Sequence, residues 1–148
     1  MQAELLPRFA GSELHALDDK GRLIVPSRFR ERLGSNFVLS IAPHDPCLVL
    51  YPTVTWTQFC ERLEEAPVKD DRFRRIVRFL FAHTEEVGFD NQGRVVIPVT
   101  LRAYAGIERQ VVSIGLLTRI EIWAKEKYQP TLQAEDEAGQ FLTGLGLY

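Results

Sequence analysis

Two short motifs in the chain place an aspartate four residues before an arginine: DDKGR begins at Asp18 and DNQGR begins at Asp90. These residue types permit two kinds of chemistry. A pair of aspartates can share one proton and divide acid and base roles between them. Alternatively, each carboxylate can organise a tight turn that holds the guanidinium group of Arg22 or Arg94 forward, toward a phosphate or the edge of a base.

The motifs belong to a longer internal repeat. The segment LDDKGRLIVPSRFRERLG, which starts at Leu17, aligns with FDNQGRVVIPVTLRAYAG, which starts at Phe89, at a constant offset of 72 residues. Apolar residues and then a proline follow the arginine in both copies, and further matches at the same offset continue to about residue 128. A duplication of this extent predicts two structurally similar half-units.

Each motif predicts a turn between two strands. In the first copy we expect a strand over 13–17 and a return strand over 22–25, joined by a tight hairpin turn. We expect the carboxylate of Asp18 to accept hydrogen bonds from the N–H groups one and two residues further on, and Gly21 to supply a positive φ. Asp90 and Gly93 are expected to organise the second turn in the same way.

A short helix is expected after each return strand. Pro26 cannot donate a ladder hydrogen bond but suits the first turn of a helix, so the pattern predicts a helix over 27–33 that ends at Gly34. Phe29 and Leu33 are spaced to face the core together. The second copy repeats the pattern from Pro98 to Gly106.

A second strand pair is expected in each copy, formed by 37–41 with 48–51 and by 111–114 with 119–123, with Gly115 in the second turn. Helices are predicted over 55–63 and 72–83, whereas the pattern weakens after Lys125. The predicted organisation is one compact domain over 1–148. It consists of a first repeat (12–63), a connecting segment with a basic helix (64–83), a second repeat (84–134) and an acidic, Gly-rich tail (135–148).

The composition is that of a globular cytoplasmic protein. The chain has 148 residues, of which 45% are hydrophobic, and carries a formal net charge of −2. It contains no apolar run near the roughly 20 residues that a membrane-spanning helix needs. Charged residues occupy the N-terminal stretch where a signal peptide would be apolar. We therefore expect a cytoplasmic protein without a membrane partner.

The basic residues favour arginine, with 14 Arg and 4 Lys. Arginine is suited to bidentate contacts with phosphate and guanine, so its placement matters more than the slightly negative total charge. Lys20 and Gln92 lie within the predicted turns and can contact phosphate and base or sugar edges. Candidate phosphate contacts on the short helices are Arg28, Arg30 and Arg102. The arginines of 72–78 could bind phosphate, contact a neighbouring subunit or face solvent, and we favour the last two.

The sequence argues against catalysis. Aspartic dyads have small, hydroxylated neighbours, whereas Asp18 precedes Asp19 and Lys20, and Asp90 precedes Asn91 and Gln92. The three histidines lack the spacing of metal ligands, and no Gly-rich phosphate loop is present. We therefore predict no catalytic residue, metal, cofactor or small-molecule substrate.

The paired motifs, together with the segment RFLFAHTEEVGFDNQGRVVIP, resemble the MraZ proteins of bacteria from about Phe9 to Trp123. The resemblance implies an α+β, β-rich fold of two pseudo-symmetric AbrB-like swapped-hairpin half-units with short flanking helices. It also implies a DNA-binding transcriptional regulator, associated with the nucleoid, that assembles into a homo-oligomeric ring. Such a regulator, which we expect to be a repressor, binds repeats in double-stranded promoter DNA upstream of its own gene and controls the division and cell-wall gene cluster.

Two alternatives stay open at this point. Arg22 and Arg94 could form salt bridges to the aspartates four residues earlier and only stabilise the turns. The whole molecule could also be a ring-forming structural or protein-binding module without DNA readout. DNA binding should weaken steeply with salt and depend on sequence, whereas a protein scaffold should show neither property.

Overall fold

The computed structural model describes residues 6–128 and 134–148. The described residues form eight strands and five short helices, which confirms the predicted α+β, β-rich class. The elements, in chain order, are β1 (Phe9–Ala16), β2 (Arg22–Ile24), α1 (Ser27–Leu33), β3 (Asn36–Ile41), β4 (Leu48–Pro52), α2 (Thr53–Glu64), α3 (Asp71–Ala82), β5 (Glu85–Gly88), β6 (Arg94–Val96), α4 (Val99–Ala105), β7 (Gln110–Leu117), β8 (Arg119–Ala124) and α5 (Ala134–Gly144).

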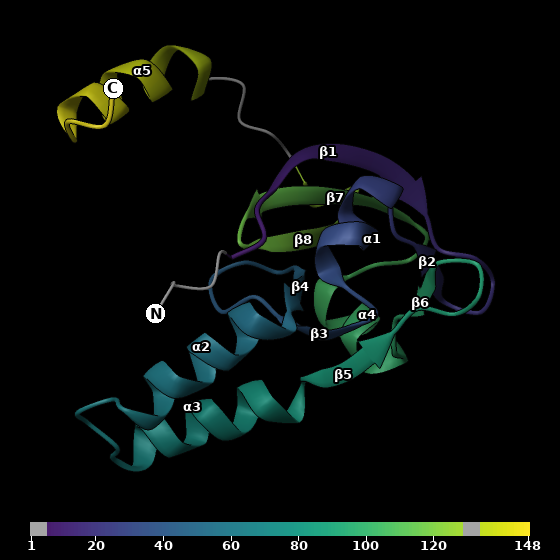
Figure 1. The fold of residues 1–148 in the computed structure, drawn as a ribbon, viewed down its shortest axis with the longest axis horizontal. Coiled ribbons are helices and arrows are strands. Elements are labelled where there is room, and N and C mark those ends of the chain that lie inside the picture. The colour runs from purple at the N-terminus through teal and green to yellow at the C-terminus, as the bar shows by residue number, and fades with distance from the viewer. Residues whose placement is uncertain (1–5, 129–133) are drawn as a thin grey trace.

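The two half-units exchange strands. The main sheet is antiparallel with the order β1-β7-β8-β4-β3-β5, so each half gives its first strand to the sheet edge formed by the other half (Figure 1). A separate two-stranded ribbon pairs β2 with β6. Leu23 lies opposite Val95 in this ribbon, and Val49 lies opposite Glu121 in the β4–β8 pair. The two residues of each pair are 72 positions apart, so they are equivalent residues of the two repeats. A pseudo-twofold axis that relates the repeats therefore passes through both pairs.

The predicted hairpin forms only at its turn. The N–H of Asp18 donates to the carbonyl of Arg22 at 2.9 Å, and the N–H of Gly21 donates to the carbonyl of Asp18 at 3.0 Å. Beyond these bonds the expected pairing of 13–17 with 22–25 is wrong, because β1 pairs with β7 and β2 pairs with β6. Strand exchange wins because it buries Leu23 and Val95 in a core that both halves supply.

The short helices follow the prediction. Helix α1 spans the expected residues, and Phe29 and Leu33 are buried on its inner face. Gly106 ends α4 in the left-handed region (φ 64°), whereas Gly34 ends α1 with a positive φ of 82° but an extended ψ. The second strand pairs, β3 with β4 and β7 with β8, also form as expected.

The predicted turn at Gly115 is wrong. Strand β7 continues through Gly115 to Leu117, which takes the positive φ of 59° at the actual turn. Gly115 instead lies where β1 crosses close to β7, and a Cβ atom there would be 2.8 Å from the Cα atom of Ala10. A glycine within a strand often marks such a close backbone approach.

Helices α2 and α3 run side by side and project from the sheet as a helical arm, called here the α2–α3 arm (Figure 1). The ring centroids of Trp56 on α2 and Phe81 near the end of α3 are 5.3 Å apart. The carboxylate of Asp70 caps α3 by accepting the N–H of Phe73 at 2.9 Å. Neither helix contains a fully buried residue, so the arm meets solvent along its length.

The C-terminal segment is more regular than its composition predicts. The expected tail over 135–148 contains α5, whereas residues 129–133 of the predicted second repeat lie outside the described part of the chain. Apolar residues recur with helical spacing at Ala138, Phe141, Leu142 and Leu145. This periodicity favours a helix even though Gly139 and Gly144 lower the intrinsic propensity.

The close approach at Gly115 gives a stability prediction. We expect Gly115→Ala to lower the free energy of unfolding by about 1–3 kcal/mol, because the added methyl group must push β1 away from β7. Urea denaturation measures the change. Gly139→Ala, where a Cβ atom meets nothing within 4 Å, is the matched control and should leave global stability unchanged. Equal stability of both variants would contradict the proposed clash.

Candidate functional site

Each motif folds into a turn organised by its aspartate. The Asp18 Oδ1 atom accepts the N–H groups of Lys20 and Arg22, both at 2.9 Å. The Oδ2 atom accepts the Nε–H of Arg22 at 2.6 Å. The predicted bond to the N–H two residues further on therefore forms, but the second bond comes from the N–H four residues further on and not from the next residue. The longer reach lets one carboxylate span the whole turn and also hold the arginine side chain.

The second turn repeats this geometry. Asp90 accepts the N–H groups of Gln92 and Arg94, both at 2.9 Å, and the Nε–H of Arg94 at 2.7 Å. Gly21 and Gly93 take φ values of 73° and 74°, as expected for the turn glycines. The predicted salt bridge from each arginine to the aspartate four residues earlier therefore forms. The Nε side of each guanidinium stabilises its turn, and the group is fixed in place by that contact.

The two turns meet along the β2–β6 ribbon. Leu23 and Val95 point into the core, so the neighbouring side chains of the ribbon point outward. Arg22 and Arg94 lie on this outer face and keep 28% and 20% of their side-chain surface exposed. Arg94 Nη1 is also 3.8 Å from Asp18 Oδ2, so the second motif reaches the carboxylate of the first.

Two apolar residues complete the outer face. Ile24 lies opposite Arg94, and Val96 lies opposite Arg22. Both apolar side chains are 56% exposed, which is high for β-branched residues within a strand. We name the outer side chains of Arg22, Ile24, Arg94 and Val96 the ribbon face. Sequence analysis missed Ile24 and Val96, because each lies in a continuous apolar run that does not show which side chain is exposed.

The helix arginines cross from one half to the other. A Cβ atom on Gly21 would lie 2.9 Å from Cζ of Arg102, and a Cβ atom on Gly93 would lie 2.9 Å from Cζ of Arg30. Each guanidinium therefore covers the turn glycine of the other half. Arg102 Nε also donates to the carbonyl of Ile97 at 3.0 Å. The absence of a side chain on the two glycines is what allows these arginines to approach the turns.

Of the predicted residues, Arg28 is the one that the structure does not bring to the turns. Its Nη2 group donates to the carbonyl of Ser12 at 2.9 Å, and its guanidinium lies 5.0 Å from the ring centroid of Phe29. These contacts direct it toward β1. Lys20 and Gln92 are exposed within the turns themselves. The structure therefore brings together Lys20, Arg22, Arg30, Gln92, Arg94 and Arg102.

The charge around the ribbon differs from that of the chain. The five basic side chains of the turns and neighbouring helices outnumber the four carboxylates nearby, those of Glu13, Asp18, Asp19 and Asp90, although the whole chain has a net charge of −2. The backbone N–H of Arg22 contributes most to holding the pKa of Asp18 below its usual 3.8, and the N–H of Arg94 does the same for Asp90. Both carboxylates are therefore ionised at neutral pH, which excludes the shared proton of an acid–base dyad.

His15 ties the ribbon to the main sheet. One ring nitrogen lies 3.1 Å from the carbonyl of Ile24 on β2, and the other lies 2.6 Å from the hydroxyl of Ser113 on β7. Burial lowers the pKa of His15, which favours a neutral ring at pH 7. A neutral imidazole can donate to one partner and accept from the other. Its role is therefore to position β2.

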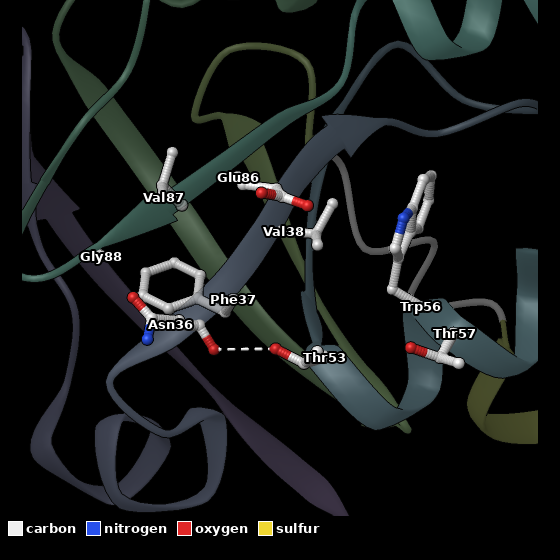
Figure 2. Close-up of a pocket in the computed structure, with 9 residues that line it drawn as sticks. All are labelled: Asn36, Phe37, Val38, Thr53, Trp56, Thr57, Glu86, Val87 and Gly88. Atoms are coloured by element: carbon white, nitrogen blue, oxygen red, sulfur yellow. Dashed lines mark hydrogen bonds between the residues drawn. The ribbon is translucent and has the colours of Figure 1, made fainter.

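A cavity of about 610 Å³ lies away from the motifs, between β3, β5 and the start of α2 (Figure 2). Phe37, Val38 and Trp56 supply apolar walls, and the hydroxyl of Thr53 donates to the carbonyl of Asn36 at 3.0 Å. Glu86 is the one acidic or basic residue in its lining. This cavity lacks the paired titratable groups from which acid–base chemistry is built.

Among residues 6–128 and 134–148, no cluster of three or more His, Cys, Asp or Glu residues could hold a metal ion. Within the same residues, no helix has the length and apolar character needed to cross a membrane.

Comparison with known proteins agrees with the repeated turns. The family model described as "MraZ protein, putative antitoxin-like" matches twice, over residues 8–79 and 80–141. The chain belongs to the MraZ family. Two copies of the family domain also match the two pseudo-symmetric half-units of the fold, as the resemblance implied.

Relatives in the family are named as transcriptional regulators. A protein of Clostridium acetobutylicum named transcriptional regulator MraZ is 48% identical over 120 residues, covering 81% of this chain and 84% of its own. Its namesake from Pediococcus pentosaceus is 41% identical over 129 residues, covering 87% and 90% of the two chains. A third, from Lachnoclostridium phytofermentans, is 38% identical over 140 residues, covering 94% and 98%. The chain is thus a member of a family of transcriptional regulators, which is not a class of enzymes.

The low pKa values of the two aspartates give a pH prediction. Because folding lowers these pKa values below 3.8, the turns stabilise the folded state above about pH 4, and this contribution disappears as the pH falls toward the folded pKa values. We expect Asp18→Asn with Asp90→Asn to be less stable than wild type at pH 7, with a difference that shrinks below pH 3.8. Urea unfolding between pH 7 and pH 2.5 measures it. A difference independent of pH would show that the carboxylate charge is irrelevant.

Proposed function

We propose that the chain is a sequence-specific transcriptional regulator that binds double-stranded DNA through the ribbon face and the two motif turns. The observation that carries the proposal is the juxtaposition of both arginines on one exposed two-stranded ribbon. An antiparallel ribbon fits the major groove of B-form DNA, and other β-ribbon proteins read bases in this way. The pseudo-twofold axis through Leu23 and Val95 suits DNA whose two half-sites are also related by a twofold axis.

Each group on the face has a role that its chemistry suits. Asp18 and Asp90 hold the Nε sides of Arg22 and Arg94, which fixes two guanidinium groups for contact with guanine or phosphate. Apolar side chains can contact the methyl group of thymine, which is the role we assign to Ile24 and Val96. Gln92 is placed to contact base or sugar edges. Phosphate contacts are assigned to Lys20, Arg30 and Arg102.

Assembly into an oligomer would compensate for the low DNA affinity expected of a chain with a slightly negative net charge. One ribbon neutralises few phosphates, so its affinity alone should be low. Several ribbons on one homo-oligomer can engage several repeats, and linked binding can raise affinity by about 10²- to 10⁴-fold. We therefore extend the proposal to a cytoplasmic, nucleoid-associated ring that represses the division and cell-wall gene cluster by binding promoter repeats upstream of its own gene. The family resemblance supports this part.

The central prediction concerns the two motif arginines. We expect Arg22→Ala with Arg94→Ala to lose the preference for the DNA upstream of this protein's gene over a shuffled duplex, because the fixed guanidinium groups supply base contacts. Fluorescence anisotropy at constant salt measures both affinities. Each good bidentate contact contributes about 1–3 kcal/mol of discrimination, so the loss should exceed tenfold.

Arg28→Ala is the matched control, because it removes an arginine directed toward β1 and should preserve the preference. Circular dichroism and sedimentation check that both proteins fold and assemble. If the double variant stays assembled and retains wild-type preference, the turns are structural and the proposal fails. Wild-type binding that ignores both sequence and salt would favour a protein-binding module instead.

A second prediction separates base contacts from phosphate contacts. Ile24→Ala with Val96→Ala should weaken binding to thymine-containing target sites more than binding to shuffled DNA, and leave the salt dependence unchanged. Lys20→Ala should weaken binding to both duplexes equally and lower the slope of log affinity against log salt by about 1. Anisotropy titrations at several salt concentrations measure both effects. If the Ile24 and Val96 variant changed the salt dependence and the Lys20 variant changed the sequence preference, the assigned roles would be wrong.

A further inference from the structure

Helix α3 of the α2–α3 arm presents an uncovered stripe to solvent. Ile76 and Phe79 are 56% and 52% exposed, which is unusual for large apolar side chains at neighbouring helical positions. Arg72 and Arg75 lie one turn earlier on the same side of the helix, at the spacing that places side chains on one face. The stripe is therefore both apolar and positively charged.

Helix α5 also has an apolar stripe, but the residues beside it are acidic. Ala138, Phe141, Leu142 and Leu145 follow the spacing of one helical face. Phe141 is 67% exposed, and Leu145, just after the helix, is 58% exposed. The sequence at the start of the helix is acidic, with Glu135, Asp136 and Glu137 in succession. An amphipathic helix of this kind is the usual ligand of an apolar surface on a helical pair.

We propose that α5 of one copy of the chain docks on the α3 stripe of the α2–α3 arm of a second copy. Apolar residues of α5 would cover Ile76 and Phe79, and its acidic start would face the arginines of α3. The contact would remove two exposed apolar patches at once, and charges of opposite sign would fix its orientation. The proposal names the subunit contact of the homo-oligomer and rests on that part of the proposed function.

The topology favours a second copy over the same chain. Strands β4 and β8 are antiparallel neighbours, so their carboxyl ends lie at opposite ends of the pair. The arm begins directly after β4, whereas the segment that leads to α5 begins directly after β8. In Figure 1, α5 lies at the upper left and the arm at the lower left, well apart from each other. A contact between two different surfaces is heterologous, and it propagates into a ring or a filament.

Two variants test the two surfaces separately. The arm variant carries Ile76→Asp and Phe79→Asp, and the tail variant ends at residue 133. Ile76 and Phe79 are exposed, as are residues 137–148 of the tail, and circular dichroism checks that each protein folds. We expect wild type to form oligomers in sedimentation velocity, and each variant alone to self-associate at least tenfold more weakly. Leu14→Asp, which alters a 54% exposed residue on β1, is the matched control and should assemble like wild type.

Mixing the two variants gives the decisive measurement. The arm variant still has α5 and the tail variant still has the arm, so an equal mixture should form a one-to-one dimer that grows no further. Arg72→Glu with Arg75→Glu should also weaken assembly, because it places like charges against the acidic start of α5. Wild-type assembly by the tail variant would overturn the proposal.

A wild-type chain that stays monomeric at every concentration, or a mixture that forms no dimer, would equally overturn it. Neither variant alters the ribbon face. If the mixing result holds while wild type shows no DNA preference, the DNA-binding proposal fails and the subunit contact stands.

Discussion

The pairing of β2 with β6 is the constraint on which the rest of the structure depends. Each strand is only three residues long and could not persist alone in water. Together they bury Leu23 and Val95 in the shared core, and this forces each first strand across to the sheet edge of the other half. The motif turns are brought together by this exchange, because each turn directly precedes one strand of the ribbon.

The exchange also makes the halves dependent on one another at the level of single side chains. Arg102 covers Gly21, Arg30 covers Gly93, and Arg94 approaches the carboxylate of Asp18. The carbonyl of Gly21 accepts the N–H of Ile97 at 2.9 Å, which adds a backbone bond between the halves. One half alone would leave its turn glycine and ribbon strand uncovered. The local order of each turn is therefore a property of the whole chain.

Sequence analysis succeeded where the determinants are local. Proline and glycine at fixed positions bound α1 and α4, and the duplication revealed the half-units. It failed where contacts between distant segments decide the structure. The segments before and after Asp18 were predicted to pair with each other as a hairpin, but each pairs with a strand of the other half. Gly115 read as a turn because its neighbour across the sheet is distant in sequence. The exposure of Ile24 and Val96 required knowledge of the pairing, because a strand end alone does not show which face is covered.

The fusion of two copies in one chain has a consequence for recognition. A ribbon built from two identical chains would have identical halves, whereas here the two strands can differ. The turn residue Lys20 is matched by Gln92, and Ile24 is matched by Val96, while the arginines are the same in both copies. Under the proposed function, the arginines would make equivalent contacts to both half-sites, and the differing residues would contact different bases. The chain could therefore bind an imperfectly symmetric site in one preferred orientation, which a symmetric dimer cannot do.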